Sequence, residues 1–170
     1  LYFSETPSNT IYEYDVKSKE TKTLASIEGS TYVWRMVFYQ DRLFLATGDN
    51  AKILEVSLSG KVSELFENSR ENHFLGLALF RDILYFSGEG LGNLYRYDIK
   101  QKKVDVLYDS YEDEINDIYV GSDGDVFFVT SSQTPKTPGG DFDYTDSFVI
   151  QEGLDKKKPD EEAEKKPTSR

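Results

Sequence analysis

A repeat constrains the fold of this chain more than any other feature of its sequence. LYFSETPSNTIYEY begins at Leu1, LFLATGDNAKILEV at Leu43 and LYFSGEGLGNLYRY at Leu84. In each copy, an apolar run is followed ten positions later by the first residue of a second apolar run. The copies recur roughly every 42 residues, a spacing that indicates a repeat architecture built from one small folding unit.

The segments inside each copy have the features of β-strands. They are short, their apolar residues follow a period of two or run continuously, and β-branched or aromatic residues dominate them. A helical interpretation fails on the same points. Twelve Tyr and eleven Phe suit pleated strands. Four short strands in roughly 40–45 residues are typical of a blade of a β-propeller, in which four-stranded antiparallel sheets stack around an axis.

Assigning the strands along the chain predicts two full blades between two incomplete ones. Residues 1–31 supply three strands and lack an innermost strand, whereas the segment after Glu114 supplies only two. We therefore expect an all-β, partial β-propeller of antiparallel blades over residues 1–131. Because repeat units cannot bury their end faces alone, the simplest interpretation is a piece of a longer propeller. A half-propeller that closes by pairing with another chain is the alternative.

Residues 132–170 depart from the repeat and form a second region. TPKTPGG, from Thr134 to Gly140, is rich in Pro and Gly, and the segment from Gly153 to Arg170 is charged and nearly free of large apolar side chains. Such a composition cannot bury enough apolar surface to order the backbone. We predict an insertion followed by a disordered tail.

Composition excludes several classes of function. The formal net charge is -11, which argues against nucleic acid or an anionic membrane surface as the main partner. No apolar run approaches the length of a membrane span, so membrane insertion is not expected. The chain contains no Cys, which excludes disulfides and thiolate metal sites. The compartment stays open, with an extracytoplasmic location slightly favoured.

Two stretches resemble a known group of propellers. FLGLALFRDILYFSG, from Phe74, is similar to the inner-strand and second-strand pattern of NHL and gluconolactonase-like (SMP-30) propellers. LYRYDIKQKKVDVLYD, from Leu94, resembles a third and fourth strand of the same kind. The resemblance covers Leu1 to about Ser131. It implies blade architecture and no particular activity, because propellers host enzymes, binders and scaffolds alike.

Aligning the inner strands identifies a position that is polar or small between apolar neighbours. Arg35, Gly76 and Asp117 occupy it. Since the inner strand of a blade lines the central channel, we expect Arg35 and Asp117 to face that channel. They either hold a ligand or ion there, or are structural charges that are solvated or paired with each other. The second interpretation is favoured, because most charges in such places are structural.

Three more residues complete the candidate ligand-binding set at the channel mouth: Asn116, Trp34 and His73. Gluconolactonase-like enzymes are expected to hold a divalent ion with carboxylates and an Asn at this mouth. Asn116 and Asp117 offer only part of that set, so no metal site is predicted. His73 is the only histidine and cannot form a His-based zinc site alone. An exposed loop histidine is its simpler interpretation.

One acidic segment matches part of a calcium-loop template. Asp141, Asp143, Thr145 and Glu152 stand at positions 1, 3, 5 and 12 of that template. Position 6 requires Gly for the sharp turn, and Asp146 stands there instead. A solvated acidic loop is the default interpretation. We predict no cofactor and keep Ca²⁺ as the one candidate.

No motif identifies a catalytic residue. The leading hypothesis is a non-enzymatic binding or assembly module, whose loops and channel mouth recognise a protein partner or the remaining propeller blades. The alternative is a metal-dependent hydrolase or lactonase of the gluconolactonase-like kind, with Asp117 and Asn116 as partial ligands. A carbohydrate-binding propeller is a third possibility that rests only on exposed aromatic residues.

Overall fold

A computed structural model describes residues 1–30 and 32–132, and these residues form thirteen strands without a helix. The strands group into four successive blades. Blade 1 holds β1 (Tyr2–Ser4), β2 (Thr10–Tyr14) and β3 (Thr21–Ser26); blade 2 holds β4 (Val33–Tyr39), β5 (Arg42–Thr47), β6 (Lys52–Ser57) and β7 (Val62–Glu67); blade 3 holds β8 (His73–Phe80), β9 (Ile83–Glu89), β10 (Asn93–Asp98) and β11 (Lys103–Asp109); blade 4 holds β12 (Glu114–Val120) and β13 (Val126–Ser131). Residues 133–170 lie outside the described residues. They hold most of the predicted insertion, its calcium-loop residues and the predicted disordered tail.

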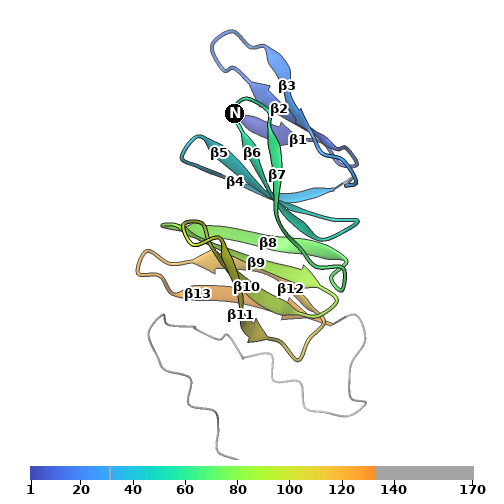
Figure 1. The fold of residues 1–170 in the computed structure, drawn as a ribbon, viewed down its shortest axis with the longest axis vertical. Helices are drawn as coiled ribbons and strands as arrows, with labels where there is room; N and C mark the ends of the chain where they lie inside the picture. The colour runs from blue at the N-terminus through green and yellow to red at the C-terminus, as the bar shows by residue number, and fades with distance from the viewer. Residues whose placement is uncertain (31, 133–170) are drawn as a thin grey trace, which may run out of the picture.

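Each blade is an antiparallel meander whose strands pair in chain order. Blades 2 and 3 have all four strands, whereas in blade 1 the described residues supply no strand inside β1. Blade 4 is joined to blade 3 by the single pair Glu114 and Glu89, so that blades 3 and 4 form one continuous six-stranded sheet. The blades follow one another along the long axis of the molecule (Figure 1). The prediction of an all-β partial propeller with two full blades is confirmed.

Every inner strand carries a β-bulge at the same place. In each of β4, β8 and β12, one residue near the start of the strand is skipped in the pairing with the second strand of the blade. The skipped residues are Trp34, Leu75 and Asn116. Because a bulge adds one residue and re-aims the side chains around it, this repetition confirms the sequence alignment of the inner strands.

A second bulge recurs on the outer strands and explains three leucines. The third and outer strands of blades 1 to 3 skip one outer-strand residue, and in each blade that residue is a leucine: Leu24, Leu65 and Leu107. All three are partly buried against a hydrophobic cluster. The bulge thus keeps a large apolar side chain at the periphery of each inter-blade core.

The hydrophobic core lies between the blades rather than in one centre. Three clusters of buried residues occupy the seams between blades 1 and 2, 2 and 3, and 3 and 4. In the middle seam, Phe86 stacks on Tyr95 at 5.0 Å and meets Phe74 edge-on at 5.1 Å. Each blade therefore depends on its neighbours for burial, as expected of repeat units.

The loop between β12 and β13 contains the pair Asp123–Gly124, which favours a two-residue type I′ turn. The hairpin forms, but within this pair only Gly124 has a positive φ, of 101°, so the turn is of another type. The Gly121 carbonyl accepts a hydrogen bond from the Gly124 N–H at 3.1 Å, and the Gly121 N–H donates to the backbone carbonyl of Asp125 at 2.8 Å. These bonds define a three-residue hairpin loop, whose last residue, Gly124, has the left-handed conformation. Positive φ at two successive residues occurs at Gln40 and Asp41, between β4 and β5, and at Asp49 and Asn50, between β5 and β6.

Candidate functional site

The five candidate residues lie where the inner strands begin. There, the end of the second strand of one blade meets the first residue of the next inner strand: Gly48 forms a bridge with His73, and Glu89 pairs with Glu114. Contacts link four of the candidates in a row from His73 through Trp34 and Arg35 to Asp117. Asn116 precedes Asp117 in the sequence. We call this set, Trp34, Arg35, His73, Asn116 and Asp117, the mouth cluster.

Arg35 and Asp117 form an ion pair that skips a blade. Arg35 Nη2 lies 3.4 Å from Asp117 Oδ1, although Arg35 belongs to blade 2 and Asp117 to blade 4. The inner strand of blade 3 has Gly76 at the intervening position, where an added Cβ would lie 2.4 Å from Ser87 Oγ. The side chains are 47% and 60% exposed, so the pair adds little stability and both groups remain accessible to a ligand.

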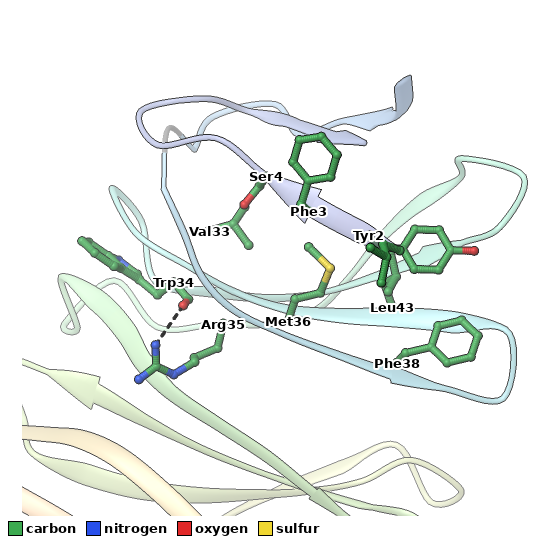
Figure 2. Close-up of a pocket in the computed structure, with 10 residues that line it drawn as sticks. Tyr2, Phe3, Ser4, Val33, Trp34, Arg35, Met36, Phe38 and Leu43 are labelled. Atoms are coloured by element: carbon green, nitrogen blue, oxygen red, sulfur yellow. Dashed lines mark hydrogen bonds between the residues drawn. The ribbon is translucent and has the colours of Figure 1, made fainter. Parts of the chain in front are cut away.

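Aromatic rings form the other half of the mouth cluster. Trp34 stacks on Tyr32, with ring centroids 5.3 Å apart and planes within 4°. His73 meets the Trp34 ring edge-on at 5.5 Å. The backbone carbonyl of Trp34 accepts a hydrogen bond from Arg35 Nη1 at 3.3 Å (Figure 2). An exposed indole and an exposed guanidinium therefore stand side by side on this rim.

The expectation that His73 is an exposed loop residue is wrong. His73 is the first residue of β8, and its side chain is only 24% exposed. Its ring lies over Gly48, where a Cβ would come within 2.2 Å of Nδ1. That Nδ1 atom is buried, and no described residue forms a hydrogen bond with it. The Nε2 atom lies 3.7 Å from Glu89 Oε2. His73 is placed by the bridge to Gly48, which the sequence of one blade could not show.

Asn116 is part of a polar group that the sequence reasoning missed. Its Nδ2 donates to Glu114 Oε2 at 3.4 Å, and Ser131 Oγ lies 3.0 Å from both Glu114 Oε2 and Asn116 Oδ1. Asp117 Oδ1 accepts from the Ile118 N–H at 3.0 Å. Glu114 occupies the position of His73 in the next blade, and this equivalence is the signal that could have identified it.

A buried carboxyl group lies behind the mouth cluster. Glu71 is 3% exposed, and it accepts hydrogen bonds from the Leu91 N–H at 3.0 Å and the Tyr95 hydroxyl at 2.8 Å. Burial raises the pKa of Glu71 above its usual value, against the effect of these two donors. Burial likewise raises the pKa of Tyr95 to about 12. The Tyr95 hydroxyl also accepts from Asn68 and Asn93.

This network fixes the connection that leads into His73. Glu71 and Asn68 lie in the segment between β7 and β8, and their partner Tyr95 lies on β10 of blade 3. The Asn72 N–H donates to the Glu89 carbonyl at 2.7 Å, one residue before His73. The start of β8 is thus held by side-chain and backbone bonds, which preorganises this part of the rim.

The groups near the mouth cluster that could bind a metal ion are Asn116, Asp117, His73 and the neighbouring Glu114 and Glu89. Within residues 1–30 and 32–132, no group of three or more His, Asp and Glu side chains is placed to hold a metal ion. Asn116 and Asp117 are adjacent but turn to different partners, Glu114 and Arg35. The mouth cluster offers the Arg35 guanidinium for hydrogen bonding and the Trp34 ring for stacking.

Many solved structures are similar to this chain, and three of them are described here. A structure of a nidogen/laminin complex matches with a TM-score of 0.61 and 14% identity, covering 75% of this chain and 51% of that chain. Streptogramin B lyase matches with a TM-score of 0.61 and 18% identity over 76% and 44% of the two chains. The computationally designed Ika8 protein matches with a TM-score of 0.53 and 16% identity over 75% and 41%.

These likenesses show the β-propeller fold. The chain spans about half the length of these structures, or less. No protein-family model and no curated protein matches it. In the part of the chain that the structure describes, there is no helix with the length and hydrophobicity needed to cross a membrane.

Proposed function

We propose that the chain is part of a non-enzymatic β-propeller module that binds a protein partner through the mouth cluster. One observation carries this proposal: Trp34, 37% exposed, and Arg35, with a side chain 47% exposed, stand side by side on the same rim. Trp and Arg are over-represented among the residues that dominate the energy of protein interfaces.

Neighbouring side chains hold Trp34 and Arg35 in place before a partner binds. Trp34 packs against Tyr32 and His73, and the Arg35 guanidinium forms an ion pair with Asp117. A side chain that is already held in place loses less conformational entropy when a partner docks. The nidogen/laminin complex shows that a protein with a similar fold occurs in a complex with another protein.

We also propose that these blades belong to a longer propeller. In blade 3, Tyr85 is paired with Ala78 and is fully buried under blade 4. In blade 4, Phe127 takes the place of Tyr85 and is paired with Tyr119, yet they are 39% and 67% exposed. Such an apolar sheet face suits a further blade packed against it.

The alternative is a metal-dependent hydrolase or lactonase with Asp117 and Asn116 among its ligands. Asp117 is 60% exposed beside Asn116, so both remain available to a ligand. Streptogramin B lyase shows that a similar fold occurs in an enzyme. The metal content of the purified protein separates the two proposals. Stoichiometric calcium or zinc that disappears in Asp117→Ala would support the enzyme and contradict the binding module.

A photo-crosslinking experiment tests the binding module directly. A benzoylphenylalanine is placed at position 34 of the protein in its native cells, and in a control at Val106, which is 46% exposed on the outer strand β11. We expect one protein to be crosslinked from position 34 and not from position 106, and Arg35→Ala to reduce the yield. Equal yields from both positions would contradict a partner site at the mouth cluster.

A further inference from the structure

The inner strands of neighbouring blades pack against one another in a row. β12 lies against β8, and β8 lies against β4. These contacts bury one apolar residue per strand on the side of the preceding blade: Leu77 is 6% exposed and Ile118 is 7% exposed. The equivalent residue of β4 is Met36, which is only partly buried. Among the described strands, the row of inner strands therefore ends at β4. The side of β4 that faces away from β8 has no further described inner strand against it.

A groove occupies the place where the row would continue. It has a volume of about 500 Å³ and lies between β1 and β4. From β4 it is lined by Val33, Met36 and Phe38, and from blade 1 by Tyr2, as Figure 2 shows. Phe38 is 51% exposed, although its ring stacks on Tyr2 at 5.8 Å. The lining is mainly apolar, as expected of an inter-blade seam.

The β1 side of the groove offers backbone hydrogen bonds. Among the described strands, β1 pairs only with β2, whereas the corresponding strands β5 and β9 are each paired on both edges. A free strand edge presents N–H and C=O groups that a further strand can satisfy. The groove thus combines an apolar floor with a hydrogen-bonding edge.

We propose that this groove binds one extended strand that pairs antiparallel with β1 and carries the inner-strand pattern of β4, β8 and β12. That pattern is a buried apolar residue, a bulged residue, a polar or small residue and a second buried apolar residue. Addition of a strand to an open sheet edge is a recurrent mode of peptide recognition. The inference rests on the repeat. Trp34 and Arg35 of the mouth cluster also line the groove, so the bound strand lies beside that cluster.

The repeat also predicts the register of the bound strand. Ile11 and Ile53 are equivalent, and they pair with Ser4 and Ala46. Ala46 in turn lies opposite Arg35 of the inner strand β4. The bound strand should therefore place its polar or small position opposite Ser4.

A synthetic peptide that copies residues 31–39, flanked by lysines for solubility, tests the proposal. We expect saturable one-to-one binding to the 170-residue chain, measured by fluorescence anisotropy. A peptide with Pro in place of Val37 cannot pair along the strand and should bind at least about tenfold more weakly. The absence of saturable binding, or equal binding of the Pro peptide, would overturn the proposal.

Variants of the chain locate the binding site. Phe38→Glu should weaken peptide binding at least about tenfold, whereas Phe127→Glu, also an exposed aromatic, should leave it unchanged. If the chain alone forms a dimer that Phe38→Glu abolishes, the groove binds a second copy and the proposal is wrong. Binding of the peptide that is insensitive to Phe38→Glu would also overturn it.

A disulfide-trapping experiment tests the register without relying on affinity. Because the chain has no cysteine, Ser4→Cys introduces a unique thiol on β1. Peptides that carry one Cys at successive positions are added under mild oxidation. We expect the greatest yield with Cys at the position of Arg35. Equal yields along the peptide would contradict the antiparallel strand.

Discussion

Tyr95→Phe removes a single hydroxyl group, yet it should destabilise the protein strongly. Tyr95 is 2% exposed, and its hydroxyl donates to Glu71 and accepts from Asn68 and Asn93. The ring itself would remain stacked on Phe86. The substitution therefore removes hydrogen bonds while leaving the packing nearly unchanged.

The expected loss follows from the groups left without a partner. A buried carboxylate oxygen that loses its donor costs about 1–3 kcal/mol, and the two amide groups, which are partly buried, add about 1 kcal/mol together. We expect Tyr95→Phe to lower the free energy of unfolding by about 2–4 kcal/mol. Tyr97→Phe, on the same strand, is the matched control: its side chain is buried, and no hydrogen bond to its hydroxyl is found among the described residues.

The decrease in the free energy of unfolding caused by Tyr95→Phe should also depend on pH, and the ionisation of Glu71 decides in which direction. Burial raises the pKa of Glu71 above its ordinary value of 4.5. The stability contributed by this group is therefore complete below pH 4.5 and is lost as the pH rises through the raised pKa. The Tyr95 hydroxyl holds that pKa down, so its removal should raise the pKa further and make the loss larger near neutral pH than in acid.

Urea denaturation at neutral and acidic pH measures both effects. We expect Tyr97→Phe to cost less than about 1 kcal/mol. Equal losses for Tyr95→Phe and Tyr97→Phe would refute the assignment of a buried network behind the mouth cluster. A loss for Tyr95→Phe that is independent of pH would refute the role of the Glu71 carboxylate in it.

Two further predictions follow from the contacts of single residues. Gly76→Val should lower the free energy of unfolding by about 2–4 kcal/mol in urea denaturation, because its Cβ would lie 2.4 Å from Ser87 Oγ and 2.9 Å from Ile118 Cγ1. Gly121→Ala should cost less than about 1 kcal/mol, because its Cβ would approach closely only the end of the exposed Asp123 side chain, with the Asp125 carbonyl at 3.6 Å. Equal losses would contradict the close packing at Gly76. Hydrogen bonds from Lys100 and Tyr39 lower the pKa of Asp82 below 3.8, so its stabilising effect should be present above pH 3.8 and disappear as the pH falls through the lower pKa. An NMR titration of the Asp82 carboxyl carbon with a midpoint at or above 3.8 would contradict these bonds.

The strands could be predicted from the sequence because the repeat presents the same pattern several times. The two full blades predicted from the repeat are observed as β4 to β7 and β8 to β11. The shared position of Arg35, Gly76 and Asp117 was likewise visible, because the inner strands align without gaps. A local pattern with period two is enough to specify these elements.

The contacts between blades could not be predicted in the same way. Glu71 lies in a connection, where a carboxylate is usually solvated, and only the packing of blade 3 over it makes it buried. His73 was expected in a loop, and a bridge to Gly48 extends β8 to include it. The ion pair across Gly76 depends on how neighbouring inner strands are stacked, which no single strand encodes.

The stacking of the inner strands is the central claim, and a pair of cysteines at positions 35 and 117 tests it most directly. The chain has no other cysteine. In Arg35→Cys/Asp117→Cys, we predict rapid intramolecular crosslinking by a short bifunctional reagent in native buffer and little in urea. Arg35→Cys/Val106→Cys is the control, because Val106 lies on the outer strand of blade 3. Failure of the first pair to crosslink in the folded protein, or equal crosslinking of both pairs, would contradict the propeller arrangement described above.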